Sequence, residues 1–303
     1  MLHEVFYWIF NMSITASITG LLVVLLRLIK AIPRRVIKIL WVIPFFRMIV
    51  PVGINSRYSV MTLMSKISTK TIKVYEFSDE VTYSMLNSVQ AAETYFPITY
   101  KVNIFEKVFA VSSIIWVTVL LIIVLFFILV YVKSLVDLQN IKHLSDNIYI
   151  SDKIKSPAVY GVFRPKIVLS EVCLNDNTKL IVEHEKVHIR HMDNLWRIFS
   201  IFIVAIHWFN PLCWMFLRMF ITDLEMSCDE FVISKLGESN KKEYALTLFD
   251  NSVNNAVVYS NFGGSNIKAR INNILTYKRI TIFSFCSFMV LILFLFYVTL
   301  TNS

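Results

Sequence analysis

Two histidines and a glutamate stand close together at His184, Glu185 and His188, in a stretch of about 179–192 whose residues favour a helix. Side chains four residues apart lie on one face of a helix, so both imidazoles can bind a single metal ion. Glu185 lies beside them, where its carboxylate can take a proton from a metal-bound water. The H-E-x-x-H spacing therefore predicts a zinc site of the peptidase kind. A solvated helix with two surface histidines is the alternative.

A third zinc ligand is expected from another segment, and the acidic stretch 223–230 supplies candidates. Glu225 and Asp229 are four residues apart and share one face of a helix. We expect Glu225 to bind the metal and Asp229 to hold the imidazole of a ligand histidine in place. Glu230 is the competing ligand, and a solvated acidic face is the alternative. The longer H-E-x-x-H-x-x-G-x-x-H motif is excluded, because the chain lacks its glycine and its third histidine.

The composition indicates a membrane protein. Of the 303 residues, 56% are hydrophobic and 17% are charged, whereas about 25% are charged in a soluble domain. About 20 apolar residues cross a bilayer, and four runs approach that length. The second run is the weakest, because it contains two prolines and an arginine. The four runs are Val5–Ile29, Ile37–Ile54, Val108–Val132 and Ile280–Leu300.

A fifth apolar run, at about 195–221, lies between the histidine motif and Glu225. A single crossing here would put the zinc ligands on opposite sides of the membrane. Asn210 before Pro211 disfavours a continuous helix, and the basic side chains in the run favour protein or interface surroundings. We therefore expect a helical hairpin that either dips into the bilayer and returns or forms the core of the catalytic domain.

Basic residues set the expected orientation. Five lysines and arginines between 27 and 38 place the loop after the first run in the cytoplasm. Residues 1–132 are then three transmembrane helices with an external loop at about 55–107. A cytoplasmic zinc peptidase domain of α+β fold follows at 133–279, and a last transmembrane helix with a short external tail occupies 280–303. The fold class expected is a mainly α membrane protein with both termini outside.

Charge and cysteine content exclude some other functions. The net charge of +9 comes partly from basic residues that anchor the chain at the inner leaflet. No nucleic-acid recognition motif accompanies it, so direct nucleic-acid binding is not expected. The four cysteines are scattered and fall in reducing or membrane surroundings, which argues against disulfides. The external loop has too few apolar residues for a core and is expected to be a connector rather than a small sensor.

A β-prone segment at 156–169 precedes the zinc helix and predicts a hairpin or two short strands. In a peptidase, a strand edge near the metal can pair with an extended substrate through backbone hydrogen bonds. Tyr160, Gly161 and Val162 are the candidates for that contact, with an ordinary structural hairpin as the alternative. The stabiliser of the oxyanion stays open. Its candidates are Tyr160, Tyr244 and Arg270.

Five segments of the chain resemble the membrane metallopeptidases of the BlaR/MecR antirepressor type, which are gluzincins. Their order and spacing agree with that family. The resemblance implies zinc on His184, His188 and Glu225, with Glu185 as the base. It also implies a cytoplasmic protease domain, activation by self-cleavage and action on a DNA-binding repressor. The segments are residues 156–169, 184–193, 208–212, 225–230 and 266–271.

One feature departs from that family. Its β-lactam sensors carry an extracellular penicillin-binding domain after the last transmembrane helix, whereas this sequence ends at Ser303 without an S-x-x-K nucleophile domain. Covalent sensing of a β-lactam by this chain is therefore not expected. Either sensing lies in the external loop, in the membrane helices or in a partner, or the chain is a relative without a sensor.

The function predicted is metal-assisted peptide hydrolysis. Zinc polarises the scissile carbonyl and activates its water, and Glu185 accepts the proton and passes it to the leaving amine. The expected partners are a cytoplasmic protein substrate, which the resemblance suggests is a DNA-binding repressor, and the lipid bilayer; a homodimer stays open. Two other functions remain: a housekeeping membrane peptidase of the HtpX or CAAX-protease type, and a non-catalytic membrane sensor or scaffold with structural zinc.

Self-cleavage is expected between Phe262 and Arg279, ahead of the last transmembrane helix. The residues from Gly263 to Asn266 can adopt the extended, accessible backbone that a protease needs. A cut there would separate the last helix from the catalytic domain.

Overall fold

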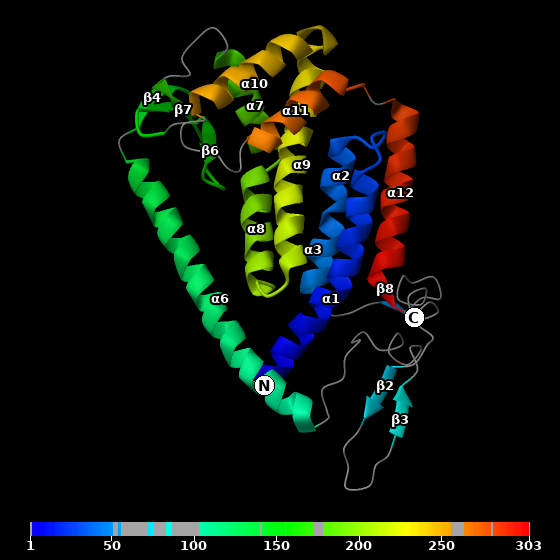
Figure 1. Cartoon of the computed structure of the whole chain (residues 1–303). Coiled ribbons are helices and arrows are strands. Elements are labelled where there is room, and N and C mark those ends of the chain that lie inside the picture. The colour runs from blue at the N-terminus through cyan, green and yellow to red at the C-terminus, as the bar shows by residue number, and fades with distance from the viewer. Residues whose placement is uncertain are drawn as a thin grey trace.

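The chain is mostly helical, with a head of shorter helices and a small sheet at one end of the long helices, of which α6 slants away from the others near the head (Figure 1). The predicted external loop falls largely outside the described residues, as does Cys173. The predicted mainly α class with a small β component is confirmed at this level. The computed structural model describes residues 2–50, 54–55, 72–75, 83–86, 103–139, 141–154, 156–171, 178–255, 264–279 and 281–302.

Two helices in the described part of the chain are long and apolar enough to cross a membrane: α1 and the part of α6 from Lys107 onward. Helix α1 is largely packed inside the protein, whereas α6 leaves most of its apolar side chains on the surface. A long exposed apolar helix is typical of a membrane-spanning segment. A shorter apolar stretch, Cys286–Leu295, belongs to α12. The bounds are Leu2–Arg27 for α1, Asn103–Asp137 for α6 and Ile282–Leu300 for α12.

The second predicted run forms two short helices, α2 (Arg34–Leu40) and α3 (Val42–Ile49), which meet at Trp41. The chain leaves α3 with Val50 in an extended conformation, as the following Pro51 requires. Both helices pack against α1 and α9 around buried aromatic side chains. The run is therefore a buried part of the bundle, shorter than the sequence suggested, and its place relative to a bilayer stays a prediction.

Helix α7 carries the histidine motif and α9 the acidic stretch, and α8 connects the two. A left-handed residue, Met192, turns the chain between α7 and α8. Asn210 begins α9 by accepting a hydrogen bond from the backbone N–H of Leu212, and Pro211 follows it at the first helical position. Helices α8 and α9 form the hairpin expected at about 195–221. The bounds are Thr178–Arg190 for α7, Asp193–Ile206 for α8 and Pro211–Leu236 for α9.

The tip of this hairpin is fixed to α1. The side chain of Asn210 donates to the hydroxyls of Ser13 and Ser17 at 2.7 and 2.8 Å. Higher up the bundle, a Cβ at Gly20 would lie 2.2 Å from the ring of Phe216, so only glycine allows α1 this close to α9. These contacts set the height of α9, and hence of its acidic residues, relative to α1.

The head contains a four-stranded sheet in the order β4-β5-β7-β6, in which β5 and β7 are parallel and the other pairs antiparallel. The expected two strands are β6 and β7, joined through Gly161, whose φ of +87° suits glycine. The central strand β7 is buried, and β6 lies at the edge beside α7. The bounds are Lys142–Ser145 for β4, Ile148–Ser151 for β5, Ala158–Tyr160 for β6 and Lys166–Ser170 for β7.

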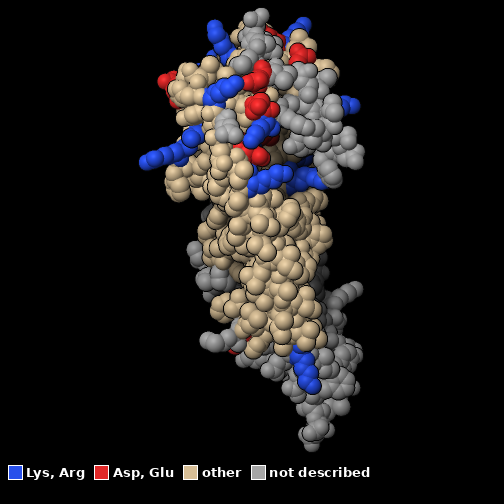
Figure 2. Space-filling view, turned by 90° about the vertical axis from the view of Figure 1, so that its left-hand side faces the viewer, with Lys and Arg blue, Asp and Glu red and all other residues tan. Residues whose placement is uncertain are grey.

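Short elements complete the chain. Helices α10 and α11 lie over the head (Figure 1). Figure 2 shows Lys, Arg, Asp and Glu gathered on the head, with a belt of other residues over the long helices. Such a charged end above an apolar belt is the surface expected of a membrane protein. The bounds are Glu238–Asn240 for η2, Lys241–Asn255 for α10, Gly264–Thr276 for α11, Ile54–Asn55 for β1, Ile72–Tyr75 for β2, Tyr83–Leu86 for β3 and Thr301–Asn302 for β8.

Candidate metal centre

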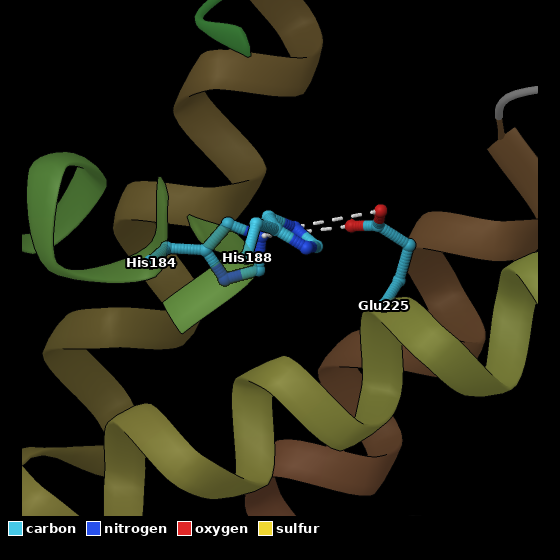
Figure 3. Close-up of side chains that lie close together, drawn as sticks. All are labelled: His184, His188 and Glu225. Atoms are coloured by element: carbon cyan, nitrogen blue, oxygen red, sulfur yellow. Dashed lines mark hydrogen bonds and ion pairs between the residues drawn. The ribbon is translucent and has the colours of Figure 1, made fainter. Parts of the chain in front are cut away.

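Helix α7 places the two histidines of the motif on one face. The Nε2 atoms of His184 and His188 lie 3.0 Å apart, and both side chains are buried. Glu225 of α9 faces them: its carboxylate oxygens lie 3.5 Å from Nε2 of His184 and 3.7 Å from Nε2 of His188 (Figure 3). The three donors lie within 4.8 Å of one another. Two imidazoles and one carboxylate, with room for a water, are the donor set of catalytic zinc, so these residues fit that metal.

The carboxylate of Glu225 is also held by two guanidinium groups. Arg197 of α8 forms an ion pair with one oxygen, and Nη1 of Arg270 of α11 lies 3.1 Å from the other. Burial by itself raises the pKa of Glu225, but the charge of Arg270, followed by that of His188, outweighs it and holds the pKa well below its usual range. Glu225 is therefore an anion, as a ligand for a metal cation must be.

A tyrosine and an aspartate hold the imidazole of His184. The hydroxyl of Tyr244 donates to Oδ1 of Asp229 at 2.8 Å, so its oxygen accepts from Nδ1–H of His184 at 2.9 Å. Arg270 donates twice to Asp229 at 2.8 Å. This arrangement leaves the lone pair of Nε2 facing the other ligands. The structure thus places Oδ1 of Asp229 3.4 Å from Nδ1 of His184, with the hydroxyl of Tyr244 hydrogen-bonded to both.

Burial and the neighbouring carboxylate of Asp229 raise the pKa of Tyr244 well above its usual value. The hydroxyl therefore stays protonated and can donate to Asp229. Tyr244, one of the three candidates for oxyanion stabilisation, already uses its hydroxyl on these two partners.

The imidazole of His188 is held by Asp193, which sequence reasoning did not single out for a role. Nδ1–H of His188 donates to Oδ2 of Asp193 at 2.8 Å, and Sγ of Cys228 lies 3.0 Å from the same oxygen. The ammonium of Lys38 in α2 donates to the other oxygen at 2.6 Å. Burial raises the pKa of Asp193, but the hydrogen bond from His188 and the charge of Lys38 outweigh it and lower the pKa to about 2. Asp193 is therefore ionised.

The competing ligand Glu230 lies five positions beyond Glu225 on α9, which turns it away from the histidines and toward α2. Its carboxylate accepts the backbone N–H groups of Arg34 and Arg35 at 3.0 and 3.3 Å, at the start of α2. It also accepts from the amide of Asn273 at 3.3 Å. These contacts are those of a residue that caps a helix and joins α9 to α2.

A cavity of about 260 Å³ opens onto the two histidines, Glu185 and Glu225. Residues 156–159, which lead into β6 and form its first two positions, are part of the cavity wall. Asn194 fixes this strand by donating to the carbonyls of Val159 and Gly161 at 2.8 and 3.1 Å. Arg270 lines the cavity as well. The predicted substrate-strand residues Tyr160, Gly161 and Val162 do not line this cavity. The residues just before them in the sequence, 156–159, do.

A sequence profile described as BlaR1 peptidase M56 matches residues 7–274. The chain belongs to this family. The match confirms the predicted resemblance to the BlaR/MecR type, a family of signal-transducing peptidases associated with membranes.

Curated relatives of this member of the M56 family include proteins named BlaR1 and mecR1. Regulatory protein BlaR1 of Bacillus licheniformis is 30% identical over 138 residues, which are 42% of this chain and 23% of the relative. Methicillin resistance mecR1 protein of Staphylococcus aureus is 29% identical over 171 residues, 50% of this chain and 29% of the relative. Regulatory protein BlaR1 of S. aureus is 25% identical over 194 residues, which are 56% of this chain and 33% of the relative. The matches thus span a third or less of these relatives.

Asp193→Asn is expected to lower the zinc affinity of this M56 peptidase about 10–100-fold, because a neutral amide holds the imidazole of His188 less firmly. Asp223→Asn is the matched control, since Asp223 is equally buried and paired with Arg27 and Arg34 but does not contact the site. Competition with a chromogenic chelator measures both affinities. Equal zinc affinity in the wild type and the Asp193 variant would contradict the role of Asp193.

Proposed function

We propose that this M56 peptidase is an integral-membrane zinc endopeptidase that hydrolyses peptide bonds in a cytoplasmic protein. The observation that carries the proposal is the convergence of His184, His188 and Glu225 on one cavity, with the carboxylate of Glu185 beside them. Zinc held there would polarise a carbonyl and lower the pKa of a bound water. The metal-binding role of these three residues and the catalytic role of Glu185 are part of the proposal.

Two other side chains that line the cavity have proposed roles in proton transfer and in stabilising the oxyanion. Glu185 is buried on α7 and lines the cavity, so it can take a proton from water and pass it to the leaving amine. Arg270 is the oxyanion stabiliser we favour among the three candidates, because its guanidinium lines the cavity and has five N–H groups, of which Asp229 and Glu225 take only three. Tyr160 does not line it, and Tyr244 is engaged with His184 and Asp229.

The edge strand β6 is the proposed place for an extended substrate. It pairs with β7 on one side only, and its first residues line the cavity with the metal ligands. A peptide added at such an edge gains backbone hydrogen bonds and crosses the metal centre. We assign the contact to residues 156–159, one step before the segment Tyr160–Val162 that the sequence suggested.

The orientation and the substrate are proposed from the basic residues and from the family resemblance. The basic residues between 27 and 38 favour a cytoplasmic head, and the family resemblance favours a DNA-binding repressor as the substrate. We propose four membrane segments, with the α8–α9 hairpin returning to the side from which it started, and leave a homodimer open.

The expected position of self-cleavage needs a correction. Residues Gly264 to Asn266 are not extended: they begin helix α11. This helix forms because Ile271 and Ile274 pack into the core beside α9 and α10, which holds the segment in a helical conformation. Phe262 and Gly263 lie outside the described residues.

The segment 277–279, between α11 and α12, has no regular secondary structure, and Lys278 and Arg279 are exposed. We propose that self-cleavage falls there, since a protease needs an accessible, irregular backbone. A cut at this point would separate α12 from the head.

The test follows a C-terminal tag in membranes, with and without a cell-wall antibiotic. A fragment the size of α12 is expected in the wild type and not in Glu185→Ala. Glu183→Ala is the control, because Glu183 lies on the same helix but pairs with Lys186 and Lys235 outside the cavity. Only full-length protein under every condition, together with unchanged levels of a co-expressed repressor, would favour a housekeeping peptidase or a scaffold with structural zinc.

A further inference from the structure

A second cavity, of about 460 Å³, lies between α2, the end of α9 and α12. It shares no lining residue with the cavity over the metal ligands. Most of its wall is apolar and comes from three helices. The apolar residues are Val36, Ile39, Phe231, Phe288, Met289 and Ile292.

Three polar atoms in the lining are buried without a hydrogen-bond partner in the described structure. They are Oγ of Ser227, Nδ1 of His191 and Nε of Arg35. Nε of Arg35 lies 3.7 Å from Glu230, close enough for an ion pair but too far for a hydrogen bond. Burying polar atoms unpaired is unfavourable. Three such atoms in one cavity indicate a ligand with polar groups of its own.

The charge of the lining favours an anion. Arg35 and Lys38 both line the cavity, and the described lining includes no acidic side chain. Both cations also hold carboxylates outside it, since Arg35 contacts Glu230 and Lys38 donates to Asp193. An anionic group that accepts hydrogen bonds would satisfy Nε of Arg35 and add to the neutralisation of the two cations.

The position of the cavity favours a lipid. Its residues on α2 lie where the head meets the long helices (Figure 1), and those of the last helix extend from Thr281, just before α12, to Ile292 near its middle. Beside and beyond these residues α12 exposes Val290, Leu293 and Phe294, along which a hydrocarbon chain can lie. A cationic pocket at the level of the headgroups, continued by an apolar wall, suits a molecule with an anionic head and acyl chains.

We propose that this cavity binds the headgroup of an anionic phospholipid, with an acyl chain along α12. The glycerol phosphate meets Arg35, His191 and Ser227. Lys38 joins this site to the metal centre, because its ammonium also donates to Asp193, which holds His188. The inference does not depend on peptidase activity.

The test measures phospholipid binding by the purified full chain in detergent, using native mass spectrometry. Phosphatidylglycerol is expected to bind about tenfold or more tightly than phosphatidylcholine. Ile39→Trp, which fills the mouth of the cavity, and His191→Leu, which removes a polar partner, are each expected to remove most of this preference. Ile49→Trp is the control, because Ile49 of α3 is 43% exposed against 44% for Ile39 and does not line the cavity.

Several results would overturn the proposal. Equal binding of the two phospholipids, or an unchanged preference in both cavity variants, would show that the lipid binds elsewhere. Inorganic phosphate that displaces the lipid at equal concentration would show a simple anion site. Wild-type protein that retains no lipid would show a cavity filled by water. Thermal unfolding of each variant is recorded, and the variant whose Tm matches the wild type decides the outcome.

Discussion

Glu185→Ala is expected to leave zinc bound and to reduce peptide hydrolysis by about 10²–10⁴-fold, the usual contribution of a general base. The reason is the position of this carboxylate, which lines the cavity beside the ligands but is not one of the three groups that converge. His188→Ala should instead lose the metal and the activity together. Zinc content by atomic emission and the rate of cleavage of a co-purified substrate separate the two effects.

The two variants together distinguish a catalytic site from a structural one. A structural zinc site has no use for a base, so a scaffold would show no hydrolysis in the wild type. Wild-type rates in Glu185→Ala would contradict the mechanism. Loss of zinc from that variant would make Glu185 a ligand and not a base.

Glu225→Gln is expected to lower zinc affinity by about 100-fold or more, since the loss of an outer residue alone costs about 10–100-fold. Glu230→Gln should leave the affinity near that of the wild type. Its expected effect is on stability, at about 1–3 kcal/mol, because Glu230 is buried and accepts the N–H groups at the start of α2. A metal-release titration and thermal unfolding, measured on both variants, give the two quantities.

The substitutions at Glu225 and Glu230 are matched in chemistry. Both residues are glutamates on α9, five positions apart, and each contacts an arginine. Stronger loss of zinc in Glu230→Gln than in Glu225→Gln would move the ligand to Glu230. That outcome would require a different packing of α9 against α7.

Most of the predicted site residues could be found from their spacing within one helix. His184 and His188 converge because a helix brings residues four apart together, and the same rule placed Glu225 and Asp229 on one face. The hairpin followed from Asn210 and the proline after it, which here begin α9. These are short-range effects, and they hold wherever the helix itself forms.

Long-range pairing could not be predicted in this way. Lys38 lies 155 residues before Asp193 in the sequence, so no local pattern connects them. Its charge was interpreted as part of a topology signal, and the structure shows that it also pairs with the partner of His188. The helix at Gly264 was missed because two glycines and a serine favour a turn, whereas burial of Ile274 against α9 overrides that preference.

The basic residues at the start of the chain have a consequence for the order of assembly. Arg27 pairs with Asp223, which follows it by 196 residues, and Lys38 pairs with Asp193, which follows by 155. At about 5–20 residues per second, translation leaves these cations without their partners for roughly 8–40 s. During that interval their charge is available to orient the first helix in the membrane. The same groups later form the ion pairs that hold α8 and α9 against α1 and α2. Membrane insertion and the packing of the head would then use one set of charges in succession.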